Sequence, residues 1–192
     1  MKKYAFLFLL CTIGFSNAQD NQAILENHFN TNRALMGLSQ EDVSDFKVAS
    51  STYSKSMRID NVYVSQRISG IEFFNSTSVF GLKNGVVVSS KMGFIPNTAQ
   101  KINTTTPVIS AQNAIVKAAT AIGISAPTAL EILETTAPTS FVFNTGSLSL
   151  NNIPVSLVFQ PMQAGPLNLA GAIRIYFLVA SLYSSMYIDT PA

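Results

Sequence analysis

Residues 62–74, with the sequence VYVSQRISGIEFF, contain the pattern that decides how the first half of this chain folds. Before Gly70, Val62, Val64 and Ile68 share one face with Gln66, as the two-residue period of a β-strand requires. Gly70 interrupts the pattern, and residues 71–82 resume it in sequence rich in β-forming residues. The dipeptide Asn84-Gly85 then predicts a hairpin, because a type I′ turn needs positive φ at both central residues. The first half is therefore expected to hold an antiparallel sheet.

A helix is predicted at the start of each half of the chain. In the first half, apolar residues between 24 and 29 share a helical face, and Gly37 is placed to end the segment. In the second half, Ser110 is a good N-cap, and apolar residues recur at four-residue spacing over 114–122. Gly123 is placed to end this second helix.

Four further strands are expected in the second half, at residues 141–143, 155–159, 173–179 and 183–188. A helix followed by antiparallel strands, with no alternation of strand and helix, indicates an α+β fold rather than a parallel sheet. The sequence predicts two small modules, each an antiparallel sheet packed with a helix, over residues 19–103 and 104–192.

The first 18 residues resemble a secretory signal peptide. Lys2-Lys3 form a positive start, residues 4–15 an apolar run, and Ser16-Asn17-Ala18 a small-residue cleavage site. The apolar run is shorter than the ~20 residues of a membrane-spanning helix. We expect cleavage near Ala18, secretion of the protein, and no membrane attachment after cleavage.

The composition of the mature chain excludes several classes of partner. Without Lys2 and Lys3 the basic residues fall from 12 to 10, which equals the 10 acidic residues. A nucleic-acid surface needs a basic excess, so no nucleic-acid partner is expected. The one cysteine, Cys11, leaves with the signal peptide, so the core alone must hold the fold.

Catalytic and metal-binding patterns are absent from the sequence. The chain has a single histidine, His28, and no HExxH sequence. His28 lies on a predicted helix with no neighbouring motif, and we interpret it as a half-exposed helix residue. No catalytic residue, metal ligand or cofactor is expected in this chain.

Charged residues become scarce in the second half. After Lys117 the only ones are Glu131, Glu134, Arg174 and Asp189. A buried sheet explains this scarcity, and so does a face that a partner or another domain covers. The sequence leaves both explanations open.

The Gln66 to Phe74 segment resembles the Q-x-x-x-G-I-x-V/F core of the propeptide of fungalysin/thermolysin-type zinc peptidases. In that family the next hairpin carries an Asp-Gly or Asn-Gly turn, which Asn84-Gly85 matches. The second half resembles the PepSY module that follows in these precursors, over Ser110 to Gly123 and at Tyr187-Ile188-Asp189. The chain departs from the family in lacking tryptophan and a zinc peptidase domain after residue 192.

The resemblance implies a secreted prosegment that inhibits its cognate zinc peptidase domain, in cis or in trans, and aids its folding. Zinc would belong to the parent peptidase and not to this chain. The residues that would contact the peptidase are those of the motif, namely Gln66, Arg67, Gly70, Ile71, Phe73 and Phe74. For Gln66, a hydrogen bond across its own sheet is favoured over direct contact with the enzyme. One of the two phenylalanines should be core and the other an interface anchor.

Two other functions remain open at this stage. One is a free-standing secreted module of the PepSY type that inhibits or binds proteases. The other is a non-enzymatic secreted structural protein.

Overall fold

The computed structural model describes residues 16–102, 104–160, 170–179 and 182–189. The predicted signal peptide falls largely on residues 1–15, outside the described residues. The helices and strands are α1 (Ser16–Asn32), α2 (Gln40–Ser44), β1 (Asp45–Ser54), β2 (Ile59–Ile68), β3 (Ile71–Lys83), β4 (Val86–Lys91), the 3-10 helix η1 (Thr98–Gln100), α3 (Ala111–Ala121), β5 (Ile132–Ala137), β6 (Ser140–Phe143), β7 (Ile153–Gln160), β8 (Ala170–Val179) and β9 (Leu182–Asp189). The fold is α+β, as the sequence predicts.

The chain divides into two compact units. The first consists of Met1–Gln66 and Ser76–Pro96, and the second of Arg67–Asn75 and Asn97–Ala192. The division near residue 96 precedes the boundary predicted at residue 103. The end of the β2–β3 hairpin, which the sequence places in the first module, contacts the second unit's residues and is grouped with them.

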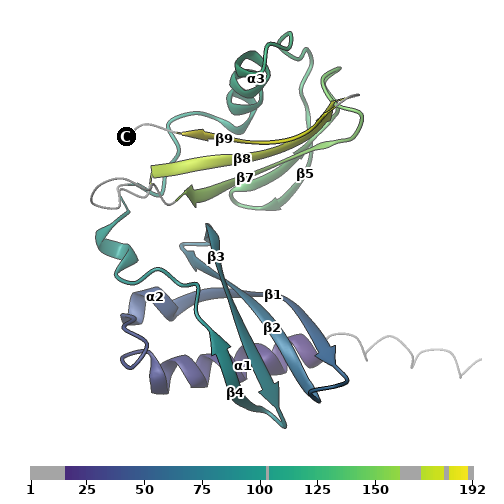
Figure 1. Cartoon of the computed structure of the whole chain (residues 1–192). Coiled ribbons are helices and arrows are strands. Elements are labelled where there is room, and N and C mark those ends of the chain that lie inside the picture. Colours follow the sequence, from purple (N-terminus) through teal and green to yellow (C-terminus); the bar gives the residue numbers. More distant parts are fainter. Residues whose placement is uncertain (1–15, 103, 161–169, 180–181, 190–192) are drawn as a thin grey trace, which may run out of the picture. The chain divides into compact units, whose positions relative to one another are not determined.

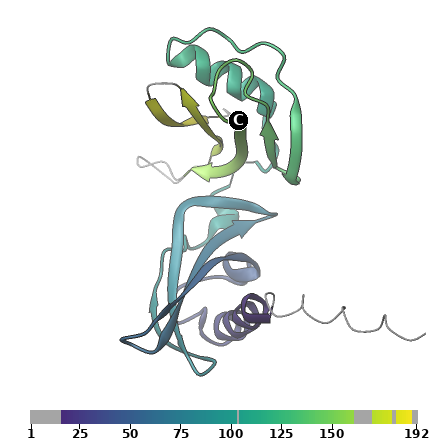
Figure 2. The same cartoon turned by 90° about the vertical axis from the view of Figure 1, so that its right-hand side faces the viewer.

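The first unit packs α1 on one face of a sheet that contains β1 to β4 (Figures 1 and 2). Its core centres on Phe29 of α1, which is 1% exposed. The Phe29 ring lies 5.1 Å from that of Phe46 and 5.4 Å from those of Phe80 and Phe94, measured between centroids. Edge-to-face and offset contacts at such distances are favourable for aromatic rings. One helix side chain thus joins strands that are distant in sequence.

The predicted turn at Asn84-Gly85 is confirmed. Asn84 has φ 50° and Gly85 φ 75°, and Lys83 pairs with Val86 across the turn. Asparagine and glycine tolerate this left-handed conformation better than other residues do. The turn sets the pairing of Leu82 with Val87 and of Lys83 with Val86, and an irregularity between Gly81 and Leu82 shifts the register of the rest of β3 and β4.

Hydrogen bonds at Ser39, the residue that precedes Gln40, define the start of α2. The Ser39 Oγ accepts a hydrogen bond from the Asp42 amide at 3.2 Å, and the Asp42 carboxylate accepts one from the Ser39 amide at 2.8 Å. This reciprocal arrangement is a capping box, which satisfies two amide groups that the first helical turn leaves without partners.

In the second unit, the predicted helix forms α3. Ser110 caps it by accepting a hydrogen bond from the Asn113 amide at 3.2 Å, and Gly123 follows its end with φ 75°. Its inward face is formed by Ala114, Ile115, Ala118 and Ala119, all 0% exposed. Small side chains of this kind let a helix approach a sheet closely.

The sheet of the second unit runs in the order β5-β6-β7-β8-β9, with each neighbouring pair antiparallel. The strands expected at 141–143, 155–159, 173–179 and 183–188 correspond to β6 to β9. β5 was not predicted from the sequence. The start of β3 also pairs with β7 in parallel register, Glu72 with Val158 and Phe73 with Phe159, so the sheet is mixed rather than purely antiparallel.

None of the helices in the described ranges has the length and apolar character required to cross a membrane.

Candidate functional site

Gln66, the first residue of the sequence motif, lies buried in the first unit and is 0% exposed. Its Nε2 donates to the main-chain oxygens of Asp42, at 3.1 Å, and of Ile95, at 2.9 Å. Its Oε1 accepts from the Ile95 amide at 2.8 Å. A buried amide side chain is costly unless such bonds compensate it. Gln66 therefore connects β2 to the α2 segment and to the chain that follows β4.

The motif glycine closes the β2–β3 hairpin. Ser69 has φ 53° and Gly70 φ 78°, and these two residues separate Ile68 from Ile71. No atom lies within 4 Å of the position that a Cβ on Gly70 would occupy. The glycine is favoured here by its left-handed backbone and not by lack of space.

The six candidate contact residues fall into two groups by exposure. Gln66, Ile71 and Phe73 are buried, at 0%, 2% and 3% exposed. Arg67 and Phe74 are half-buried, and Gly70 is exposed. The Phe73 ring packs on that of Phe159, with centroids 4.8 Å apart, so Phe73 is the core member of the phenylalanine pair. A partner of this hairpin would reach Arg67, Gly70 and Phe74.

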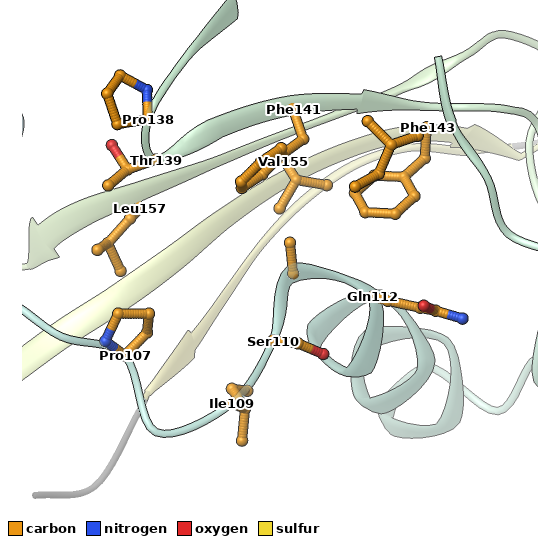
Figure 3. Close-up of a pocket in the computed structure, with 12 residues that line it drawn as sticks. Pro107, Ile109, Ser110, Gln112, Pro138, Thr139, Phe141, Phe143, Val155 and Leu157 are labelled. Atoms are coloured by element: carbon orange, nitrogen blue, oxygen red, sulfur yellow. The ribbon is translucent and has the colours of Figure 1, made fainter. Parts of the chain in front are cut away.

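A pocket with a cavity volume of about 370 Å³ lies in the second unit, between the start of α3 and the sheet (Figure 3). The lining is largely apolar and comes from the segment before and at the start of α3, the β5–β6 turn, and the strands β5 to β7: Pro107, Ile109, Ser110, Ala111, Gln112, Ile132, Pro138, Thr139, Phe141, Phe143, Val155 and Leu157. This volume falls within the range typical of ligand pockets. None of these described lining residues carries a charged side chain.

The strand β5 forms one border of this pocket. Its six residues are all exposed, including Ile132 and Leu133, each at 54%. β5 was not predicted because its apolar residues do not alternate: Ile132 and Leu133 are adjacent, and Glu134 follows them. Ile132-Leu133 and Thr135-Thr136, followed by Pro138 in a turn, are the signal that identifies it in retrospect.

The single histidine lies in an aromatic environment on α1. The His28 ring contacts those of Phe29 and Phe80 edge to face, with centroids 6.3 and 5.8 Å apart. Its Nδ1 lies 3.4 Å from the Asn32 side-chain nitrogen, and its buried Nε2 has no hydrogen-bond partner. Desolvation by burial lowers the pKa of His28 below its ordinary value of 6.5.

Across the ranges that the structure describes, no group of three or more histidine, cysteine or acidic residues is arranged to hold a metal ion.

No protein-family model matches this chain, and no curated protein is similar to it in sequence.

Proposed function

We propose that this chain is a secreted, non-catalytic prosegment that inhibits a fungalysin-type zinc peptidase and assists its folding, acting in cis or in trans. The proposal rests on the likeness of the Gln66 to Phe74 segment to the propeptide motif. It also places zinc and the catalytic residues in the partner and not in this chain.

The main structural support for the proposal is that the motif residues have distinct structural roles in or beside one hairpin. Gln66, near the end of β2, makes three hydrogen bonds to Asp42 and Ile95. Gly70 occupies the turn of the hairpin, and Ile71 and Phe73 are buried at the start of β3. The spacing of these residue types is thus explained by a particular local structure. The hairpin therefore provides a structural reason for the spacing of the motif, and the function itself is proposed from the resemblance of sequence.

Contact with the peptidase is proposed for the accessible part of the hairpin. Phe74 is half-buried while Phe73 packs on Phe159, so Phe74 is the candidate anchor. An aromatic anchor at the centre of an interface typically contributes ~2 kcal/mol or more to binding. Because the anchor is apolar, inhibition should depend only weakly on salt.

The test is an inhibition assay with the purified chain added to a fungalysin-type zinc peptidase. We expect stoichiometric inhibition by the wild-type chain, weaker inhibition by Phe74→Ala, and unchanged inhibition by Tyr63→Ala, an exposed aromatic outside the motif. Circular dichroism of each variant separates loss of binding from loss of fold.

The outcomes distinguish the proposal from its alternatives. A folded chain that gives no inhibition at ~100 μM, where binding is worth only about −5.5 kcal/mol, would favour a secreted structural protein. Inhibition of proteases of other catalytic classes with equal strength would favour a free-standing protease-binding module.

A further inference from the structure

The pocket of the second unit and the outer edge of β5 adjoin through Ile132, which lines the pocket and begins the strand. β5 pairs with β6 on one side. On its other side, no strand pairs with it in the part of the chain that the structure describes. An edge strand presents main-chain N–H and C=O groups on which another strand can form.

The register of β5 assigns its side chains to two faces. Ile132 pairs with Phe143 and Thr135 with Phe141, and both phenylalanines line the pocket. Cross-strand partners share a face, so Ile132 and Thr135 lie on the pocket face. The register shifts between Ile132 and Glu134, and Glu134 pairs with Val142, which is not a pocket residue. Glu134 therefore lies on the opposite face.

The charges near this edge have one sign. Between residues 118 and 160 the only charged side chains are those of Glu131 and Glu134, and both are exposed. Glutamates on an edge strand oppose pairing with a second copy of the same strand, because like charges would meet. They favour a partner that brings lysine or arginine to the same face.

The pocket volume favours side chains of an extended segment over a whole helix. A helix with its side chains is a cylinder roughly 10–12 Å across, so even one helical turn needs more space than the cavity provides. The cavity volume is about 370 Å³. Recognition by strand addition combines main-chain hydrogen bonds at an edge with pockets for alternate side chains. The β5 edge and the adjoining pocket offer both.

We propose that the outer edge of β5 binds an extended peptide in which apolar and basic side chains alternate. The apolar side chains enter the pocket between β5–β7 and the start of α3. The basic side chains lie on the opposite face, beside Glu134. This interaction goes beyond the prosegment function and does not depend on the partner being a peptidase.

The probe is the hexapeptide Lys-Val-Lys-Val-Lys-Val, acetylated at its N-terminus and amidated at its C-terminus. It is titrated into the purified chain, and binding is measured by isothermal titration calorimetry. We expect saturable one-to-one binding that weakens as salt rises, since exposed charges are screened. Three control peptides separate the contributions: one with glutamate replacing lysine, one with serine replacing valine, and one with alternate main-chain amides N-methylated. Each should bind at least ~10-fold more weakly, a loss of about 1.4 kcal/mol.

Two variants of the protein test the two faces independently. Glu134→Lys should weaken binding of the lysine peptide at least ~10-fold and strengthen binding of the glutamate peptide. Ala111→Phe places a ring at the pocket lining and should likewise weaken binding, whereas Ala121→Phe, at an exposed position of the same helix, should not. Thermal melting of each variant verifies the fold.

Several results would overturn the proposal. The N-methylated peptide binding as tightly as its parent would exclude strand addition. Tighter binding of an amphipathic helical peptide, or concentration-dependent dimerisation of the chain abolished by Ala111→Phe, would assign the surface to another occupant. If the folded chain does not bind the peptide at ~1 mM, the surface does not recognise this class of peptide and the proposal is wrong. A negative result here leaves the peptidase assay unaffected, so the two proposals fail separately.

Discussion

The two units cover their sheets with helices of different size, and the consequence is visible in the cores. The first unit uses α1, a helix of 17 residues, which places the large rings and branched side chains of Phe29 and Leu25 against the strands. The second uses α3, a helix of 11 residues, whose inward face is mostly alanine. Large helix side chains fill the space above a sheet, whereas alanines bring the helix close but cover less of it. The apolar face of β5–β7 therefore remains partly open as the pocket.

The same contrast extends to polar groups. In the first unit the buried side chain of Gln66 satisfies main-chain groups of two separate segments. In the second unit the pocket lining is largely apolar and the adjoining strand β5 is exposed. The first arrangement satisfies its polar groups within one unit, while the second leaves apolar surface accessible to solvent. Four measurements test this difference.

The largest expected effect comes from truncating the central ring of the closed core. Phe29→Ala should lower the free energy of unfolding by roughly 3–5 kcal/mol, because it removes apolar burial and leaves a cavity. Phe141→Ala, at the open pocket, should cost only about 1–2 kcal/mol, since this ring is already half-exposed. Urea denaturation of both variants measures the difference, and equal losses would contradict the contrast between closed and open cores.

The next effect concerns the buried amide. Gln66→Met keeps the length of the side chain but removes three hydrogen bonds, leaving main-chain groups at Asp42 and Ile95 without them. We expect a loss of about 3 kcal/mol in the free energy of unfolding. Gln100→Met, at an exposed position, should change it by less than ~0.5 kcal/mol. If Gln66→Met is as stable as the wild type, the assignment of Gln66 as a connecting residue is wrong.

A smaller effect is expected at the β3–β4 turn. Gly85→Val should lower stability by about 1 kcal/mol or more, because a β-branched residue resists the positive φ of 75°. No atom lies within 4 Å of the position that a Cβ would take, so the loss measures the backbone conformation alone. Gly85→Asn, which tolerates this conformation better, is the matched control and should recover most of the loss. The thermal midpoints of the two variants provide the measurement.

The smallest effect is the pH dependence contributed by His28. Its pKa is lowered in the folded chain, so below 6.5 the unfolded chain binds the proton more readily. The contribution of His28 to stability is complete above pH 6.5 and declines as pH falls below that value. The difference in unfolding free energy between wild type and His28→Gln should therefore change over this range. Parallel pH profiles for the two proteins would mean that His28 titrates normally in the fold.

Local features were predictable from the sequence because their causes lie within a few residues. The Asn84-Gly85 turn, the Ser110 cap and the glycine after α3 each depend on φ preferences or on hydrogen bonds to near neighbours. The strand β5 was missed because its β-forming residues do not alternate with polar ones, and its pairing with β6 decides its conformation. The grouping of the β2–β3 hairpin end with the second unit was missed for the same reason: it depends on contacts with residues far along the chain.

The sequence by itself determined the α+β class, the turns and caps, and the motif from Gln66 to Phe74. Only the tertiary structure decided what those motif residues do: Gln66 bonds to segments 24 and 29 residues away, and Phe73 packs on Phe159. It also decided that β5 stands at an edge beside an apolar pocket. The physical reason is that backbone conformation responds to neighbouring residues, whereas burial and pairing depend on which distant segments the fold brings together.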